Sequence, residues 1–174
     1  HVTGNTVIDA LIEIRDRIDA GRMTSETSVL LAQFTRPYVL ITGHRRESFG
    51  GGMKRICTAI ATLARRRPEI DWVYPVHLNP HVQEPVRRTL GQLTNVHLLP
   101  PQGYEAFVAL MSRSRLLLTD SGGVQEEAPA LGKPTLVMRD KTERTEGLGG
   151  GVELVGTDPA RIIGCVERLR DDPV

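Results

Sequence analysis

The sequence carries no excess of either charge sign. It holds 22 Lys and Arg against 21 Asp and Glu, which gives a formal net charge of +1. Proteins that bind nucleic acid or a membrane surface through their overall field usually show a clear basic excess, so this balance disfavours both classes. A site for an anionic ligand must therefore be built from a local group of residues.

Long apolar runs are missing as well. No run approaches the ~20 residues that cross a bilayer. The N-terminus also lacks a basic segment followed by an apolar one, so we expect neither a membrane-spanning helix nor a secretory signal. The sequence starts at His1 without an initiator methionine. Two explanations stay open: the sequence is a fragment, or earlier residues are not included in it.

Cysteine is scarce. Cys57 and Cys165 stand far apart inside segments with a helical pattern, so we expect reduced thiols in a cytosolic protein rather than a disulfide framework. The histidines are too scattered, and the cysteines too remote, for a zinc-binding pattern.

Short apolar runs alternate with longer amphipathic stretches along the chain. Such short runs, rich in β-branched residues, suit strands of a parallel sheet that is buried on both faces. The predicted strands are Tyr38–Thr42, Trp72–Val76, Val96–Leu99, Leu116–Thr119, Thr135–Met138 and Val152–Val155. The predicted helices are Thr6–Ile18, Met53–Arg66, His81–Leu93, Tyr104–Ser112, Val124–Leu131 and Pro159–Arg170, with a linker or short helix over Ser25–Arg36. The alternation predicts an α/β fold with a Rossmann-like doubly wound parallel sheet.

The segments that follow the predicted strands are rich in His, Arg, Glu and Gly. They are Gly43–Gly52, His77–Pro80, Pro100–Tyr104, Asp120–Glu127 and Arg139–Arg144. In an open α/β sheet, ligands bind at the carboxyl ends of the strands. We therefore expect these segments to meet at one edge of the sheet and to form a site there.

One of these segments, Ser-Gly-Gly at Ser121–Gly123, has the pattern of a phosphate site. Two glycines let the backbone approach a ligand closely, and the helix that follows offers free N–H groups and the positive end of its dipole. Glu126 and Glu127 lie about one turn into that helix, where a carboxylate can accept hydrogen bonds from a ribose diol. The turn is neither G-x-G-x-x-G nor a P-loop, which disfavours dinucleotide-binding proteins and P-loop NTPases. A plain tight turn with exposed acids beyond it remains the alternative.

Cationic side chains follow two other strands. His44, Arg45 and Arg46 come directly after the first strand, where arginine could clamp a pyrophosphate with its planar fork of donors. The alternative is a solvated charged loop. His77 could serve the same site or only satisfy backbone groups, and Arg144 is either a second phosphate-facing cation or a surface residue.

Taken together, these motifs resemble the non-hydrolysing UDP-N-acetylglucosamine 2-epimerase family. The matching stretches run in order along nearly the whole chain: Val2–Leu11, Thr42–Gly50, Tyr74–Pro80, Thr119–Pro129, Gly132–Asp140 and Val155–Asp158. Members of that family have two Rossmann-like domains arranged as in GT-B glycosyltransferases. The resemblance covers only the C-terminal half, with a linking helix and linker over residues 1–35 and a Rossmann-like UDP-binding domain over residues 36–174.

The resemblance also implies roles for individual residues. His44 and Arg144 would contact the diphosphate, with His44 as the catalytic residue of this chain. Ser121, Gly122 and Gly123 would bind phosphate at the helix start. Glu127 would hold the ribose hydroxyls, and Gln102 and Phe107 would lie at the uracil. Arg45 and His77 match positions where some bacterial members bind a second, activating UDP-GlcNAc.

The family inverts C2 of UDP-GlcNAc to give UDP-ManNAc, by elimination of UDP to a glycal and its re-addition. Cations and a helix dipole that stabilise departing UDP suit that reaction, and the resemblance implies no metal or nicotinamide cofactor. The carboxylates that move the C2 proton belong to the N-terminal domain, so we expect this chain alone to be inactive. The resemblance further implies a cytoplasmic homodimer that acts in cell-envelope polysaccharide synthesis, without nucleic-acid or membrane partners. A GT-B glycosyltransferase domain and a non-catalytic UDP-sugar-binding module remain alternatives.

The sequence departs from the family pattern at one loop. Family members commonly have Glu-Arg-Pro-Glu followed by small residues, whereas this chain has Glu143–Glu146 with threonine in place of proline and then a glycine-rich run. Loss of proline and gain of glycine widen the conformational freedom of a chain. We therefore predict a mobile loop over Glu143–Gly151.

Overall fold

The core of the fold is one parallel sheet of six strands in the order β3-β2-β1-β4-β5-β6. The computed structural model describes residues 4–145 and 148–171. The strands are β1 (Tyr38–Thr42), β2 (Asp71–Pro75), β3 (Val96–Leu99), β4 (Leu116–Thr119), β5 (Thr135–Val137) and β6 (Val152–Leu154). This order reverses its direction between β1 and β4, which is the topological switch point of a doubly wound sheet. The predicted fold class and all six predicted strands are confirmed.

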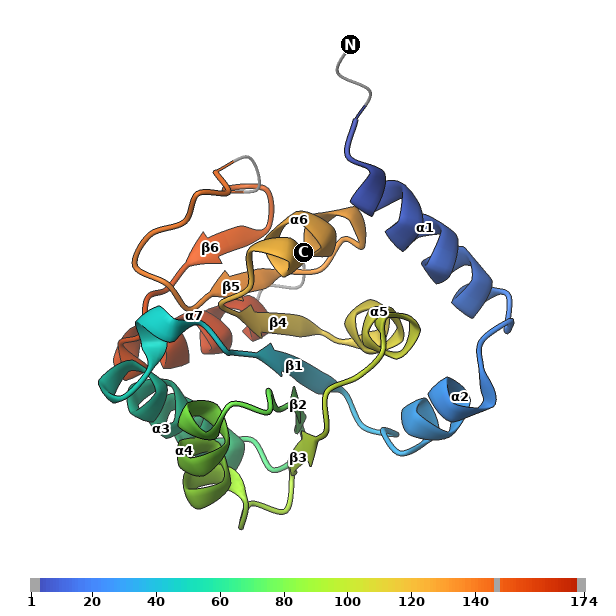
Figure 1. Ribbon diagram of the computed structural model, residues 1–174. Helices are drawn as coiled ribbons and strands as arrows, with labels where there is room; N and C mark the ends of the chain where they lie inside the picture. The colour runs from blue at the N-terminus through green and yellow to red at the C-terminus, as the bar shows by residue number, and fades with distance from the viewer. Residues whose placement is uncertain (1–3, 146–147, 172–174) are drawn as a thin grey trace.

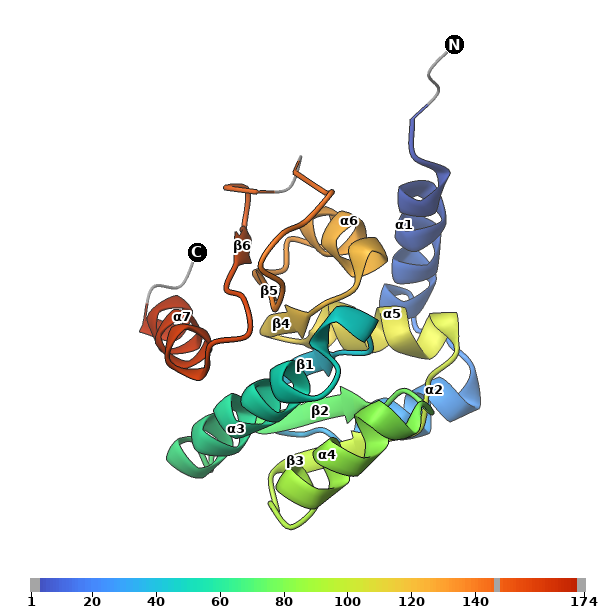
Figure 2. The same cartoon turned by 60° about the vertical axis from the view of Figure 1, so that its left-hand side comes forward.

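Helices cover both faces of the sheet (Figure 1). They are α1 (Thr6–Asp19), α2 (Ser25–Ala32), α3 (Gly51–Arg66), α4 (Pro80–Leu90), α5 (Tyr104–Arg113), α6 (Gly122–Ala130) and α7 (Pro159–Asp171), with a short 3-10 helix at Arg46–Ser48. Helices α3, α4 and α7 pack on one face, and α1, α2, α5 and α6 on the other. Figure 2 shows α3 and α4 side by side across the first of these faces.

The apolar strand residues explain why both faces need cover. Successive side chains of a strand point to opposite faces, and in β1 Ile41 packs under α3 while Leu40 packs under α5. Both side chains are 0 % exposed. Strands that are buried on both faces in this way are typical of a parallel sheet between two layers of helices.

Helix bounds differ from the predictions at several ends. Helices α3 and α6 begin two residues earlier than predicted, at Gly51 and Gly122, because their first turns consist of glycines that add nothing to the apolar pattern. Helix α4 ends at Leu90 rather than Leu93, just before Gly91. The segment predicted as a linker or short helix contains helix α2, which is capped by the Thr24 side chain.

The first two helices share a core with the rest of their face. Leu11 and Ile18 of α1 and Leu31 of α2 are buried in the same cluster as Leu110 of α5. Helix α2 is also tied to α5 by Glu105, whose carboxylate accepts hydrogen bonds from nearby backbone and hydroxyl groups of the α2 start. The division of the chain between residues 35 and 36 stays a prediction.

Among the described residues, none of the helices combines the length and the apolar character that a bilayer crossing requires. Cys57 is buried and Cys165 half-buried, and both are free thiols. The predicted mobility of the loop over Glu143–Gly151 stays a prediction, and two of its residues, 146 and 147, lie outside the described part of the chain.

Candidate active site at the switch point

The carboxyl ends of β1 and β4 are locked together at the switch point. Thr42 and Thr119 end these neighbouring strands, and their hydroxyl groups share a buried hydrogen bond of 2.6 Å. The loops that follow must then diverge to reach helices on opposite faces, which leaves a crevice between them. This crevice is where a doubly wound fold binds its ligand.

Asp120 fixes the loop that follows β1. Its side chain is 0 % exposed, and its carboxylate accepts hydrogen bonds from the backbone N–H of His44 at 2.9 Å and of Arg45 at 2.8 Å. The His44 Nδ1 atom lies 3.6 Å from the same carboxylate. A buried carboxylate needs such donors, so the start of the His-Arg-Arg loop and the end of β4 are held as one unit.

Gly43 lies where no side chain fits. A Cβ atom at this position would stand 2.9 Å from the hydroxyl oxygen of Tyr74. That hydroxyl donates a hydrogen bond of 3.0 Å to the Gly43 carbonyl oxygen, and complete burial raises the pKa of Tyr74 well above its ordinary value. The close approach brings the loop after β1 down onto β2.

Helix α6 starts directly in the crevice. β4 ends at Thr119, two residues before Ser121. The Ser121 backbone N–H bonds to the Thr119 hydroxyl, which turns the chain out of the ladder, and Ser121 becomes the N-cap of α6. Its hydroxyl makes no capping hydrogen bond to the helix. The N–H groups of the first helical turn have no acceptor within the helix, and they lie next to that hydroxyl.

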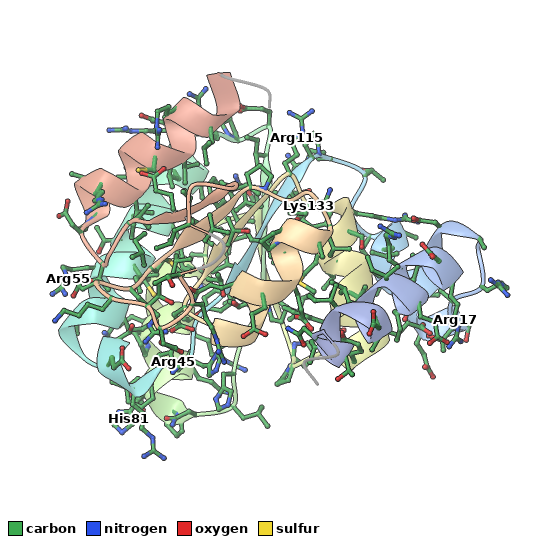
Figure 3. The ribbon with its side chains drawn as sticks, turned by 90° about the horizontal axis from the view of Figure 1, so that it is seen from above. Arg17, Arg45, Arg55, His81, Arg115 and Lys133 are labelled. Carbon is green, nitrogen blue, oxygen red and sulfur yellow. The ribbon has the colours of Figure 1, made fainter. Side chains whose placement is uncertain are left out.

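Charged side chains converge on Gly122, the first residue of α6. A Cβ atom there would lie 3.1 Å from Nη2 of Arg45, 3.3 Å from Oε1 of Glu143 and 3.8 Å from Nε of Arg144. Figure 3 shows Arg45 on the side of the molecule away from Arg115 and Lys133, which precede β4 and β5 at the opposite edge of the sheet. Two guanidinium groups and one carboxylate thus lie at the positive end of the α6 dipole.

Carboxylates hold these guanidinium groups in place. Arg144 Nε lies 2.7 Å from Glu126, and Arg45 Nη2 lies 3.5 Å from Glu143. The pKa of Glu143 is lowered, first by its own backbone N–H and then by a hydrogen bond from Arg139. Thr142 donates to Gln125 of α6 at 2.6 Å, which fastens the loop that carries Arg144 to the helix.

Glu127 lies one turn further into α6 and is buried. Its carboxylate accepts a hydrogen bond of 3.0 Å from the hydroxyl of Tyr104, the first residue of α5. Burial raises the pKa of Glu127, and the negative charge of Glu126 raises it further, while the bond from Tyr104 opposes both. The contact brings the segment after β3 to the same edge as the α6 start.

Two predicted residues lie in that segment and in α5. Gln102 is half-buried, and its side chain donates to the Pro100 carbonyl oxygen at 2.7 Å. Phe107 is partly buried and packs against the core under α5. They lie on the α5 side of the crevice, beyond Tyr104.

His77 lies on the other side, at the end of β2. Its ring stacks on that of His44, with centroids 5.4 Å apart and an interplanar angle of 16°. Its Nδ1 atom accepts a hydrogen bond from the backbone N–H of Asn79. Arg45, the residue after His44, reaches toward Gly122. The predicted pairing of Arg45 with His77 at one ligand stays a prediction.

Some residues of the site escaped prediction from the sequence. Asp120, Tyr104, Glu143 and Arg139 were not singled out, although Asp120 directly precedes the Ser-Gly-Gly turn and Arg139 lies two residues past the end of β5. A carboxylate or guanidinium at the end of a buried strand is itself a signal, because such a group must find partners in the neighbouring loops.

The fold and the charges at the start of α6 define a class, namely a Rossmann-like α/β domain with paired arginine and glutamate side chains at its switch point. A family model described as UDP-N-acetylglucosamine 2-epimerase matches residues 1–173, and this chain belongs to that family. It is 54 % identical over 178 residues to the UDP-N-acetylglucosamine 2-epimerase of Yersinia pestis, a match that covers 98 % of this chain and 46 % of the relative. The chain thus spans about half the length of the curated relatives it matches.

Solved structures show the same relationship. The structure of UDP-GlcNAc 2-epimerase from Neisseria meningitidis bound to UDP-GlcNAc has a TM-score of 0.93 and 44 % identity, over 98 % of this chain and 47 % of that chain. The Methanocaldococcus jannaschii enzyme in complex with UDP-GlcNAc and UDP has a TM-score of 0.83 and 27 % identity, over 99 % and 48 %. An ADP-heptose heptosyltransferase II from Escherichia coli, at 16 % identity and a TM-score of 0.61 over 84 % and 51 %, shares the fold alone.

Proposed function

We propose that this chain supplies the UDP-binding half of a UDP-N-acetylglucosamine 2-epimerase. The observation that carries the proposal is the start of α6, where Ser121 is the N-cap with its hydroxyl free of a capping bond and the guanidinium groups of Arg45 and Arg144 lie close to Gly122. A helix N-terminus with added cations is a site for phosphate groups. Because the chain belongs to this family, a UDP-sugar is the ligand we expect at this site.

The diphosphate would lie at this helix start, on Ser121, Gly122 and Gly123, with Arg144 beside it. His44 would contact it from the loop after β1, oriented by the Asp120 carboxylate near its Nδ1 atom. Donors that are fixed before the ligand arrives stabilise a developing charge without reorganising. That is what departure of UDP from C1 of the sugar demands.

The nucleoside would extend toward α5. Glu127 would accept hydrogen bonds from the ribose hydroxyls, and Gln102 and Phe107 would lie at the uracil. The link from Tyr104 to Glu127 supports this direction, because it joins the α5 side of the crevice to α6 at one turn from the phosphate site.

The reaction would be the conversion of UDP-GlcNAc to UDP-ManNAc by elimination and re-addition of UDP, without a cofactor. This chain would stabilise UDP as it leaves and returns, and His44 would be its catalytic residue. The proton at C2 would be moved by residues of the other half of the enzyme, so the isolated chain would bind UDP without catalysing epimerisation.

We also propose a cytoplasmic location, a homodimeric full-length enzyme, and a second UDP-GlcNAc near Arg45 and His77.

A non-catalytic UDP-sugar-binding module is the second candidate, and the half-length match to the relatives favours it for the chain taken alone. The alternative of a GT-B glycosyltransferase domain is supported only by similarity of fold. Turnover of UDP-GlcNAc without an acceptor by the complete enzyme separates an epimerase from a glycosyltransferase.

Calorimetry of the chain with UDP and with UDP-GlcNAc, beside an epimerisation assay, tests the proposal. We expect UDP to bind and UDP-ManNAc not to form. Arg144→Gln should weaken UDP binding about tenfold, since it removes a charge-assisted contact, whereas Arg17→Gln, at the exposed end of α1, should leave it unchanged. Absence of UDP binding to the folded chain would refute the site, and epimerisation by the chain alone would refute the division of labour between the halves.

A further inference from the structure

Arg139 is a buried cation beside the switch-point site. Its side chain follows β5 and is only 8 % exposed. A buried guanidinium is costly unless carboxylates compensate its charge. Its Nη1 atom lies 2.9 Å from Glu143 and its Nη2 atom 3.6 Å from Glu47, whereas Nε has no hydrogen-bond partner among the described residues. Both ends of its fork are therefore occupied by carboxylates.

These two carboxylates come from the two loops that border the start of α6. Glu47 lies in the loop after β1, and Glu143 lies in the loop after β5. The second oxygen of Glu143 faces the site, at 3.5 Å from Arg45 Nη2 and 3.3 Å from the place of a Cβ atom on Gly122. A row of alternating charges thus runs from Glu47 through Arg139 and Glu143 to Arg45.

The position of Glu143 poses an electrostatic problem for an anionic ligand. A carboxylate at the helix start repels a diphosphate and competes with it for Arg45. Arg139 pairs with Glu143 on the side opposite the ligand. Because Arg139 is buried, it stays in place, whereas an exposed cation would move freely in solvent. A cation held there weakens the attraction between Glu143 and Arg45.

We propose that Arg139 is a positioning residue of the diphosphate site, which engages Glu143 so that the Arg45 guanidinium stays available to the ligand. The inference rests on the proposed function, because it takes the diphosphate of UDP as the anion at α6. Arg139 acts through Glu143 and does not touch the ligand, since both arms of its fork are already paired.

A double-mutant cycle measured by calorimetry with UDP tests this role. Arg139→Gln should weaken UDP binding about tenfold, the size of a typical coupling between contacting charges, because Glu143 then faces the diphosphate uncompensated. Glu143→Gln should bind UDP at least as tightly as the parent chain, because it removes the carboxylate that repels the diphosphate. The double variant Arg139→Gln/Glu143→Gln should recover that affinity, because it removes the opposing charge along with its counter-ion.

Two controls distinguish this role from a merely structural one. Glu47→Gln removes the other partner of Arg139, which is further from Gly122, and should shift the melting temperature while leaving UDP affinity within about threefold. The loss in Arg139→Gln should also shrink in 1 M salt, which screens charges and not packing. If Arg139→Gln does not fold, the neutral and apolar Arg139→Met takes its place in the same cycle.

The outcomes are separable. A double variant that binds UDP as weakly as Arg139→Gln overturns the inference. If Arg139 were only structural, or if it bound the phosphate directly, removing Glu143 would not restore binding. Failure of the parent chain to bind UDP overturns the proposed function instead. Rescue by the double variant, with Glu47→Gln unaffected in binding, supports the positioning role.

Discussion

Two carboxylates at the switch point, those of Asp120 and Glu127, are both buried but differ in the hydrogen-bond donors around them. Asp120 is buried to hold two backbone N–H groups, and Glu127 is buried against a tyrosine hydroxyl. Burial removes the hydration of a carboxylate. Of these two carboxylates, only Asp120 replaces it with several hydrogen-bond donors of the chain. Glu127 keeps acceptor capacity that the described residues do not fill, which is the property of a group that binds a ligand.

Glu127→Gln should separate stability from binding. Since the folded-state pKa of Glu127 is raised by burial, the charged carboxylate opposes folding above that pKa, and the neutral amide should raise the free energy of unfolding at pH 7. UDP affinity should fall about tenfold or more, because a charged acceptor is lost. Urea unfolding and calorimetry measure the two effects. A variant that is destabilised at pH 7 contradicts the argument, and Glu69→Gln, an exposed site, serves as the control.

Gly43 makes the second prediction at this scale. Gly43→Ala places a methyl group against the Tyr74 hydroxyl, and overpacking of this kind costs about 1–3 kcal/mol. Tyr74→Phe removes the hydroxyl, so Gly43→Ala should cost less in that background. Urea unfolding of both single variants and the double variant tests the pair. Simple additivity of the two losses would show that the steric contact is not the cause.

At the scale of elements, helices are joined by a few polar groups at their ends. Helix α2 is attached to α5 through Glu105, which accepts hydrogen bonds from the Thr24 backbone N–H, the Thr24 hydroxyl and the Thr27 hydroxyl. Helix α1 touches α6 through Asn5, which donates to Glu126 at 3.1 Å. These end contacts add to the apolar packing of Leu11, Ile18 and Leu31 that holds the two N-terminal helices on their face of the sheet.

Glu105 makes the attachment of α2 dependent on pH. Its pKa is lowered from 4.5, first by the Thr24 backbone N–H and then by the hydroxyl groups. A lowered folded-state pKa means that the contribution to stability is complete above pH 4.5 and is lost as the pH falls from there through the folded-state value. Glu105→Gln should flatten the fall of the urea midpoint over this range. An unchanged pH profile, with Glu69→Gln as the reference, would contradict the assignment.

Prediction from the sequence succeeded for elements whose apolar pattern is complete. The runs Tyr38–Thr42 and Leu116–Thr119 match β1 and β4 residue for residue. It failed at the helix starts Gly51 and Gly122, where glycine leaves no pattern to detect. The site could be predicted only as far as the loops at one edge of the sheet. The pairing of Arg139 with Glu47 could not, because it joins the loop after β5 to the loop after β1 and depends on how far the side chains reach.

For the molecule as a whole, the positive and negative charges nearly balance. The formal net charge is +1, yet guanidinium groups from two separate loops meet at the start of one helix. The field that attracts an anion is therefore short-ranged and arises from the topology, since only the strand order brings these loops together.

The same strand order has a consequence for how the chain folds. β1, β2 and β3 pair in succession along the chain, but the pairing of β1 with β4 joins residues such as Thr42 and Thr119, which are 77 positions apart. Pairings over long separations are slow to form, because loop closure must precede any gain from contact. We expect the crevice between β1 and β4 to be assembled late. A ligand that rests in it would then retard unfolding much more than it hastens folding, so its presence would lengthen the lifetime of the native chain.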